Sequence, residues 1–278
     1  MAKIGIALIT YNRFDRARQV IGRVIEQTRS PIELVIADDG STDGTGDWFR
    51  QAGFTVIGRE NRGVCWNKNR GLYALLARGC ETLLLLEDDI YPVEFGWEEE
   101  WDRATQAHDH LAYAHDKIAA QIVSGAGTAA DPYVNNKATA QCTAVSLRAM
   151  QKVGFLDTRF HGYGVGHAEW TSRIKHVGYG FRRIELPDGR RPRANLYIKG
   201  GLLAEDAKSW RDNASVAVNK EIFKQLKSEP PFRMPWNDEA ERAAFLEEQR
   251  AAGIDVSQVE APGFFAPFEV RTPVETAA

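Results

Sequence analysis

Short apolar runs alternate with amphipathic stretches along the first ninety residues of the chain. The apolar runs are typical of strands buried on both faces, and they cover residues 4–10, 32–37, 54–57 and 83–86. The stretches between them carry apolar residues at helical spacing over residues 14–27, 47–52 and 66–78. Strands that alternate with helices through short loops predict an α/β fold, with a mostly parallel, doubly wound sheet and flanking helices.

The pattern becomes less regular after residue 92. An amphipathic stretch over residues 93–111 predicts a long helix, and shorter helices are predicted over residues 147–153 and 170–177. Two further strands are predicted over residues 118–123 and 141–145. The proline-containing stretches at residues 227–240 and 260–278 predict an extended segment and a frayed end.

Polar residues follow three of the predicted strands. These are Tyr11-Asn12, Asp38-Asp39 and the acidic run Glu87-Asp88-Asp89. Parallel sheets bind ligands at the carboxyl ends of their strands, so we expect the three groups to converge on one crevice.

The acidic run is the strongest candidate for chemistry. Three adjacent carboxylates repel one another and raise each other's pKa, and a divalent cation such as Mg²⁺ or Mn²⁺ relieves that cost. Alternation along an extended chain places Glu87 and Asp89 on one side and Asp88 on the other. The alternative for this run alone is a solvated acidic turn.

Composition and charge narrow the class of protein. The 278 residues carry a formal net charge of −3, which gives no whole-chain basic field for nucleic acid. The three cysteines lack CxxC spacing, so the sequence implies neither a disulfide framework nor a zinc site. No apolar run approaches the roughly 18 residues of a membrane helix, and the first residues do not resemble a signal peptide, so we expect a cytoplasmic protein.

Five arginines gather around a predicted turn at residues 187–189. This cluster predicts an exposed hairpin, with a phosphate or acceptor site as the alternative, and it comprises Arg182, Arg183, Arg190, Arg191 and Arg193.

Five motifs in the first ninety residues, taken in order, resemble those of family 2 glycosyltransferases with the GT-A fold. They are TYNR at 10–13, DDGSTDGT at 38–45, ENRG at 60–63, NKNRGL at 67–72 and LEDD at 86–89. Further on, GFLDTRFHGYGVGHAEWTSRI at 154–174 resembles the acceptor-side segment of that family. The resemblance covers residues 4 to about 180 and implies a GT-A domain over residues 1–226. Within it, residues 1–115 would form the nucleotide-sugar-binding half and residues 116–226 a less regular acceptor-side half, followed by an extension at 227–278.

The resemblance also implies an activity and a donor site. The family transfers a sugar from a nucleotide diphosphate sugar, most commonly a UDP-sugar, to an acceptor hydroxyl with inversion. Carried over by position, the donor site would comprise Thr10, Tyr11, Asn12, Arg13, Asp38, Asp39, Ser41, Asn61, Lys68, Asn69 and Asp88. The turn at 68–70 would border the base and the diphosphate.

The acidic run resembles the D-x-D element of the family. Asp89 would be the principal ligand of Mn²⁺ or Mg²⁺, with Glu87 in the place of the usual first Asp. A divalent ion that bridges the two phosphates neutralises the leaving group without proton transfer.

The acceptor-side segment departs from the family pattern. Gly166-His167 stands where relatives have Glu-Asp, and the next acidic residue is Glu169. An inverting transfer needs a base for the acceptor hydroxyl, so the resemblance offers His167 or Glu169 as that base, or His167 as a metal ligand. The alternatives are a helix cap for His167 and an arginine-paired structural role for Glu169.

Two rival functions share this fold family. A nucleotidyltransferase would carry a glycine-rich basic signature after the first strand, which TYNRFDRARQ lacks. A non-catalytic nucleotide-sugar-binding protein is the other alternative. The acceptor stays open among a glycan, a lipid-linked intermediate, a protein, a small molecule and a modified nucleic-acid base.

Overall fold

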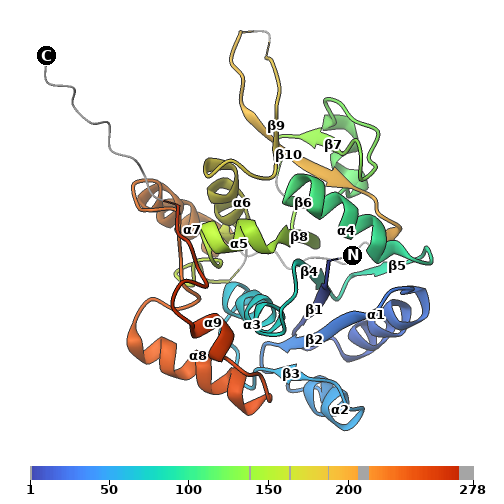
Figure 1. Ribbon diagram of the computed structural model, residues 1–278, viewed down its shortest axis with the longest axis vertical. Coiled ribbons are helices and arrows are strands. Elements are labelled where there is room, and N and C mark those ends of the chain that lie inside the picture. The colour runs from blue at the N-terminus through green and yellow to red at the C-terminus, as the bar shows by residue number, and fades with distance from the viewer. Residues whose placement is uncertain (1, 138, 163, 187, 206–212, 269–278) are drawn as a thin grey trace, which may run out of the picture.

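One large sheet runs through the molecule, with helices on both of its faces (Figure 1). The strand order is β3-β2-β1-β4-β8-β6-β10-β7, with β9 paired to β10, and β5 and β11 form a separate two-stranded sheet. The computed structural model describes residues 2–137, 139–162, 164–186, 188–205 and 213–268.

The first half of the chain builds the parallel part of the sheet. Its strands are β1 (Ile4–Thr10), β2 (Ile32–Asp38), β3 (Val56–Ile57) and β4 (Thr82–Glu87), all mutually parallel along the order β3-β2-β1-β4. The connecting helices are α1 (Phe14–Gln27), α2 (Thr45–Gln51) and α3 (Val64–Ala77). Each of these elements lies where the apolar pattern predicted it, within two or three residues at each end.

Alternation along the strands divides the core between the two faces. Leu83 and Leu85 of β4 lie in the cluster under α3, whereas Leu84 and Leu86 lie in the cluster under α1. Successive side chains of a strand point to opposite faces, so a strand covered on both faces must be apolar throughout. This explains why all seven residues of β1 are buried.

The second half adds the antiparallel part of the sheet. β8 (Cys142–Ser146) runs antiparallel to β4, and β6 (His110–Tyr113) runs antiparallel to β8. The remaining strands are β5 (Ile90–Pro92), β7 (Tyr133–Asn135), β9 (Phe181–Arg183), β10 (Arg193–Ile198) and β11 (Leu202–Ala204). The helices of this half are α4 (Trp97–His108), α5 (Leu147–Val153) and α6 (Gly166–His176).

Two sequence predictions in this half are wrong. The helix predicted over residues 93–111 spans only α4, because Asp109 adopts a φ of +68° and the chain turns there into the buried strand β6. The carboxylate of Asp109 accepts a hydrogen bond from the Ser146 hydroxyl at 2.6 Å, which fixes this turn. The strand predicted over residues 118–123 is replaced by the 3₁₀ helix η1 (Asp116–Gln121), in which Ile118 alone is buried.

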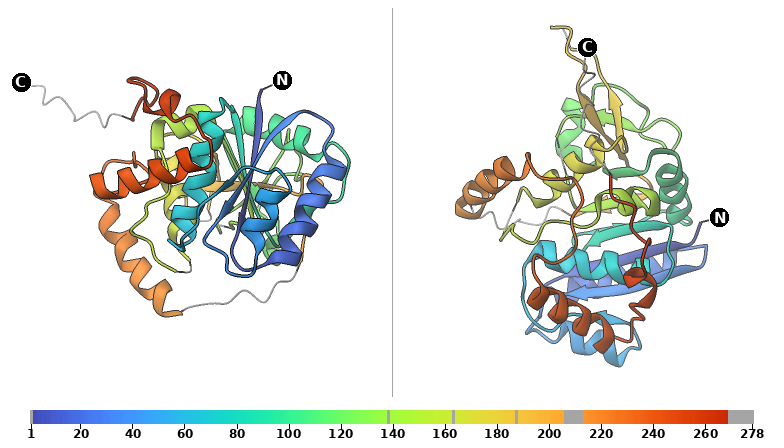
Figure 2. Two further views of the ribbon diagram at one scale, coloured as in Figure 1. Left: turned by 90° about the horizontal axis from the view of Figure 1, so that it is seen from below. Right: turned by 60° about the vertical axis from the view of Figure 1, so that its left-hand side comes forward.

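In the described part of the last third of the chain there are three helices, α7 (Asn213–Leu226), α8 (Glu239–Ala251) and α9 (Ser257–Glu260). α8 and α9 pack back against α3 (Figure 2), and Phe245 of α8 contacts both Trp66 and Tyr73. The stretch predicted to be extended, residues 227–240, has no helix until Asp238, which caps α8. The last ten residues of that extension, 269–278, lie outside the described residues. No helix in the described ranges is long and apolar enough to cross a membrane.

The segment before α8 is held against the turn that follows α5. The Arg233 N–H donates to the Val153 carbonyl at 3.0 Å, and the Phe155 N–H donates to the Arg233 carbonyl at 2.9 Å. Gly154 lies between these two bonds with a φ of +66°, and a Cβ there would overlap the Arg233 carbonyl. Glycine is therefore required at this position for both its backbone conformation and its lack of a side chain.

Replacing this glycine should be more costly than replacing one that has only the positive φ. We expect Gly154→Ala to lower the free energy of unfolding by about 3 kcal/mol, because strain and overlap add. Gly253 has a φ of +75° and no atom within 4 Å of a Cβ built on it, so Gly253→Ala should lower it by only about 1 kcal/mol. Urea denaturation measures both values, and equal losses would contradict a close contact at Gly154.

Candidate functional site

The loops that follow β1 and β2 are joined by hydrogen bonds at the carboxyl edge of the sheet. The Asn12 N–H donates to the Ser41 hydroxyl at 2.8 Å, and the Thr42 N–H donates to the Asn12 side-chain oxygen at 2.7 Å. Asn12 adopts a φ of +50°, a conformation that asparagine tolerates better than most residues. Tyr11 beside it is exposed. The predicted convergence of the first two polar groups is therefore present.

Asp88 joins the end of β4 to the end of β1. The Thr10 hydroxyl donates to one carboxylate oxygen of Asp88 at 2.8 Å, and Arg13 donates to the other at 2.9 Å. Burial raises the pKa of Asp88 to about 6, and the charge of Arg13 opposes that rise. Asp88 is thus held by the last residue of β1 and by Arg13, which precedes α1.

Glu87 and Asp89 have different surroundings. The ammonium group of Lys68, which is 2 % exposed, lies 2.6 Å from a carboxylate oxygen of Glu87, so Glu87 already has a cation. One oxygen of Asp89 accepts a weak bond from Gln141 at 3.3 Å, whereas the other is buried and has no partner among the described residues. Burial, and next the charge of Glu87, raise the pKa of Asp89.

The free oxygen of Asp89 fits a metal ligand. A buried carboxylate oxygen without a donor is costly, and a hard divalent cation would satisfy it. The described ranges contain no cluster of three or more His, Cys, Asp or Glu side chains that could hold a metal. One or two carboxylates are nevertheless sufficient for Mg²⁺-type sites in which substrate phosphates supply the other ligands.

Asp38 borders a hollow beside the second polar loop. The hollow has a volume of about 320 Å³, and its lining includes Asp38, Ser41 and Arg59. The Ser41 hydroxyl donates to Asp38 at 2.5 Å, while burial raises the pKa of Asp38.

Asp39 points instead toward the loop after β3 and toward α3. Its carboxylate accepts from the backbone N–H groups of Arg62 and Gly63 at 2.8 and 3.0 Å. It also accepts from the guanidinium of Arg70, at 2.9 Å, and Arg70 itself has no exposed surface. Burial raises the pKa of Asp39, and these donors oppose the rise.

Two other predicted donor-site residues differ in position. Asn61 is exposed in the same loop as Arg62. Asn69 is fully buried, and its side-chain amide both donates to and accepts from the backbone of Leu156, at 2.9 and 3.0 Å. The structure therefore does not place Asn69 at the crevice, because its amide ties α3 to the chain after α5.

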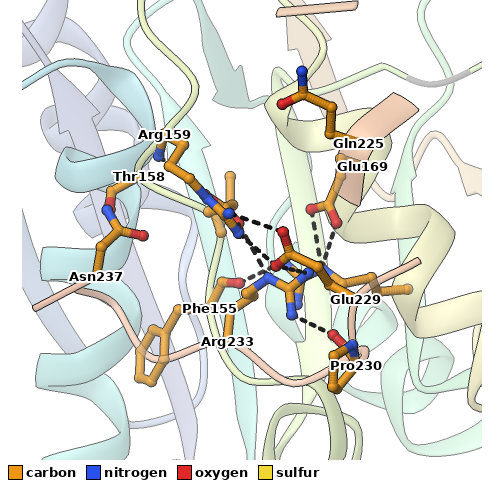
Figure 3. A network of polar contacts seen from close by, with 12 residues as sticks. Phe155, Thr158, Arg159, Glu169, Gln225, Glu229, Pro230, Arg233 and Asn237 are labelled. Atoms are coloured by element: carbon orange, nitrogen blue, oxygen red, sulfur yellow. Dashed lines mark hydrogen bonds and ion pairs between the residues drawn. The ribbon is translucent and has the colours of Figure 1, made fainter. Parts of the chain in front are cut away.

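Glu169 lies inside a network of ion pairs and hydrogen bonds (Figure 3). Both of its carboxylate oxygens accept from the Arg173 Nε, at 2.8 and 2.9 Å, and only 2 % of Glu169 is exposed. The other nitrogens of Arg173 donate to three backbone carbonyls, those of Val153, Phe155 and Pro231. These contacts match the arginine-paired structural role rather than that of a base open to substrate.

His167, two residues earlier, has no charged hydrogen-bond partner among the residues that the structure describes. Its Nδ1 is buried and has no hydrogen-bond partner in the described part of the chain. Burial is the largest of the effects that lower the pKa of His167 well below its ordinary value, and the charge of Lys68 is the next. A hydrogen bond with the Thr139 backbone acts in the opposite direction on this pKa but is weaker. The imidazole is therefore neutral at pH 7 and carries a lone pair, as a base or a metal ligand must.

A second histidine lies behind His167. The Thr171 hydroxyl lies 3.1 Å from Nε2 of His110 and 3.3 Å from Nε2 of His167. Nδ1 of His110 lies 2.8 Å from the Ala144 carbonyl, which can only accept, so His110 carries its proton there. Burial lowers the pKa of His110 to about 4.

The five arginines of the predicted turn form a hairpin, made by β9 and β10, that projects from the body of the molecule (Figure 1). The turn residue 187 lies outside the described residues. Each arginine has an acceptor nearby: Asp131 for Arg182, the Arg191 carbonyl for Arg183, Asp188 for Arg190, Glu185 for Arg191 and the His176 carbonyl for Arg193. These contacts favour the exposed hairpin over an anion site.

Residues 6–118 match the family model described as glycosyl transferase family 2. This range contains every strand and loop that meets at the crevice from the first half of the chain. Residues 6–118 form a glycosyltransferase domain of family 2. A search of curated protein sequences finds no match to this chain.

Solved structures show that the glycosyltransferase has the GT-A fold. One neighbour is the mannosyltransferase PcManGT from Pyrobaculum calidifontis in complex with GDP-Man and Mn²⁺, at 15% identity and a TM-score of 0.54, covering 90% of this chain and 70% of that one. Another is GalNAc-T7 with UDP, GalNAc and Mn²⁺, at 12% identity and a TM-score of 0.53 over 93% of this chain. The glycosyltransferase spans 53% of the length of that second neighbour.

Three residues near the site were not predicted from the sequence of this glycosyltransferase. Gln141 contacts Asp89, His110 lies behind His167 through Thr171, and Glu248 of α8 binds Arg70. None of them stands in a motif, and each reaches the site only through strand pairing or helix packing between segments distant in sequence.

The buried histidine makes the stability of the glycosyltransferase sensitive to acid. In the unfolded chain a histidine binds its proton near pH 6.5, whereas His110 in the folded chain does so near pH 4. The unfolded state therefore binds more protons in this window, and stability contributed by neutral His110 is lost as pH falls from about 6.5 to 4, by about 3 kcal/mol.

We expect His110→Asn, which keeps a donor for the Ala144 carbonyl, to reduce this acid-induced loss of stability, measured by urea denaturation at stepped pH. The exposed-residue control His161→Asn should retain the parent profile, and an unchanged profile in His110→Asn would contradict the assignment.

Proposed function

We propose that the protein is a metal-dependent glycosyltransferase that moves a sugar from a nucleotide diphosphate sugar to an acceptor hydroxyl, with inversion at the sugar carbon. The observation that carries this proposal is the buried oxygen of Asp89, beside the polar loops of β1 and β2, which has no hydrogen-bond partner within the described ranges. The two fold neighbours, whose structures contain Mn²⁺ with GDP-Man or with UDP, support it.

Asp89 is the proposed ligand for Mn²⁺ or Mg²⁺, with Glu87 beside it. When bound, the ion would offset the negative charge that the nucleotide diphosphate gains on leaving. Lys68, which is buried against Glu87, would add a fixed positive charge on the same side of the crevice.

The nucleotide is proposed to lie against the ends of β1 and β2. Tyr11 is exposed there and offers an aromatic face, and Asn12 and Ser41 are held rigidly against each other. Asp38 borders a hollow at this edge, whereas Asp39 and Asp88 would act mainly by fixing the loops that surround the nucleotide. Thr10 and Arg13 belong with Asp88 in that role.

A UDP-sugar is the proposed donor, and a GDP-sugar is the first alternative because one fold neighbour is in complex with GDP-Man. The rival in the same fold family, a nucleotidyltransferase, would release pyrophosphate from a nucleoside triphosphate and form a nucleotide sugar instead. Product analysis after incubation with Mn²⁺ distinguishes the two activities. A glycosyltransferase that hydrolyses its donor releases free sugar and nucleoside diphosphate, whereas a nucleotidyltransferase releases pyrophosphate.

The metal assignment has a direct binding test. We expect Asp89→Ala to abolish the gain in UDP or GDP affinity that Mn²⁺ gives the parent, measured by calorimetry with and without EDTA, because the ion loses its main protein ligand. The control Asp188→Ala, on the exposed hairpin, should keep the full Mn²⁺ effect. Retention of that effect in Asp89→Ala would refute the assignment.

His167 is proposed to serve the reaction and Glu169 to serve the fold. We expect Glu169→Gln to lower the free energy of unfolding by about 3 kcal/mol, because Arg173 is left buried without its counter-charge, but to keep donor turnover well below its melting temperature. His167→Ala should instead remain folded and lose turnover, at least tenfold. Excess Mn²⁺ should restore turnover only if His167 acts as a metal ligand. The reverse pattern in the two variants would return the base to Glu169.

A further inference from the structure

Helix α8 brings a carboxylate to Arg70, the residue that binds Asp39 at the end of β2. Glu248 binds Arg70 through two parallel hydrogen bonds, from Nε at 2.7 Å and from Nη2 at 2.8 Å. The indole N–H of Trp66 also donates to Glu248, at 3.1 Å. Glu248 thus enters the first half of the molecule from a helix that lies 178 residues further along the chain than Arg70.

Arg70 has an acceptor for each of its five N–H groups. Two are taken by Glu248, and the other three go to Asp39, the Asn67 side-chain oxygen and the Glu60 carbonyl, at 2.9, 3.3 and 3.0 Å. A planar guanidinium whose N–H groups are all hydrogen-bonded has one orientation. The carboxylate that binds two of these N–H groups therefore fixes the direction of the other three. The orientation of the bond to Asp39 therefore depends on Glu248.

Asp39 in turn fixes the loop between β3 and α3. Its carboxylate accepts from the N–H groups of Arg62 and Gly63, which end that loop. The backbone of Asp39 immediately precedes Gly40 and Ser41, and Ser41 borders the hollow beside Asp38. A shift of the Asp39 side chain would thus change its bonds to this loop, directly beside the backbone of residues 40 and 41 that borders the hollow.

We infer that Glu248 is a positioning residue for nucleotide binding, acting through Arg70 on Asp39 and on the loop at residues 60–63. This inference rests on the proposed function, because it assumes that the nucleotide lies against the end of β2. It assigns α8 to the donor site, although α8 lies outside residues 6–118 that match the family model. Glu248 would not touch the nucleotide, and its effect would be on affinity rather than on the bond that breaks.

The nearly isosteric variant Glu248→Gln tests this role. It keeps one acceptor for Arg70 and removes the charge and the second parallel bond. We expect the dissociation constants of UDP and GDP, measured by calorimetry in EDTA, to rise about tenfold, and the KM of donor hydrolysis with Mn²⁺ to rise while kcat holds. The matched control is Glu247→Gln, because Glu247 is exposed on the same helix turn and should bind nucleotide like the parent.

A double-mutant cycle separates positioning from a general loss of stability. If Glu248 acts through Asp39, Glu248→Gln should add little to the loss of affinity already caused by Asp39→Asn. Additive losses would indicate an effect that does not pass through Asp39 and would overturn the inference. Parent-like nucleotide affinity in Glu248→Gln would overturn it as well.

Two further results keep the outcomes distinct. If the parent binds neither UDP nor GDP, with or without Mn²⁺, the proposed function itself fails. If Glu248→Gln does not fold, judged by circular dichroism, Trp66→Phe replaces it, because this change removes one bond to Glu248 and keeps an aromatic ring. A two- to threefold loss of affinity is then expected, and parent-like affinity would overturn the inference.

Discussion

A guanidinium with no exposed surface must find an acceptor for every N–H group, because leaving charge and donors unpaired in the interior costs several kcal/mol. Arg70 sets this requirement at the centre of the glycosyltransferase domain. The end of β2, the loop after β3 and helix α8 are each placed to meet it, through Asp39, the Glu60 carbonyl and Glu248. Gly58 leaves space for this group, since a Cβ there would overlap the Asp38 carbonyl oxygen and would lie 2.9 Å from the guanidinium carbon.

The acceptor-side half is organised by a second buried guanidinium under the same requirement. Arg173 binds one carboxylate, that of Glu169, and three backbone carbonyls from two separate stretches of chain. Neighbouring ion pairs of Asp157 with Arg159 and Arg233 extend the network toward the segment before α8 (Figure 3). In both halves, a buried arginine therefore joins segments that are distant in sequence by binding their carbonyl and carboxylate oxygens.

The sequence was sufficient for the parallel half of the fold and for the convergence of its loops. There each strand is a short apolar run, and the folded sheet buries that run on both faces, so the apolar pattern of the sequence is sufficient to locate the strand. It failed where a single backbone conformation decides the path, as at Asp109, which ends α4 and begins a buried strand. It also placed Asn69 at the crevice, because a motif gives the residue type and not the direction in which the side chain leaves the helix. Gln141 and Glu248 could not be predicted, since strand and helix packing alone bring them to the site.

The return of α8 onto α3 has a consequence for how this molecule can be divided. Tyr73 of α3 contacts Phe155, Trp236 and Phe245, all beyond residue 118, so the side of α3 that carries Tyr73 is covered from outside the family-matching segment. A fragment ending near residue 118 would expose that face to water and leave the charge of Arg70 balanced by Asp39 alone. The segment recognised by family resemblance is therefore shorter than the segment whose packing covers α3.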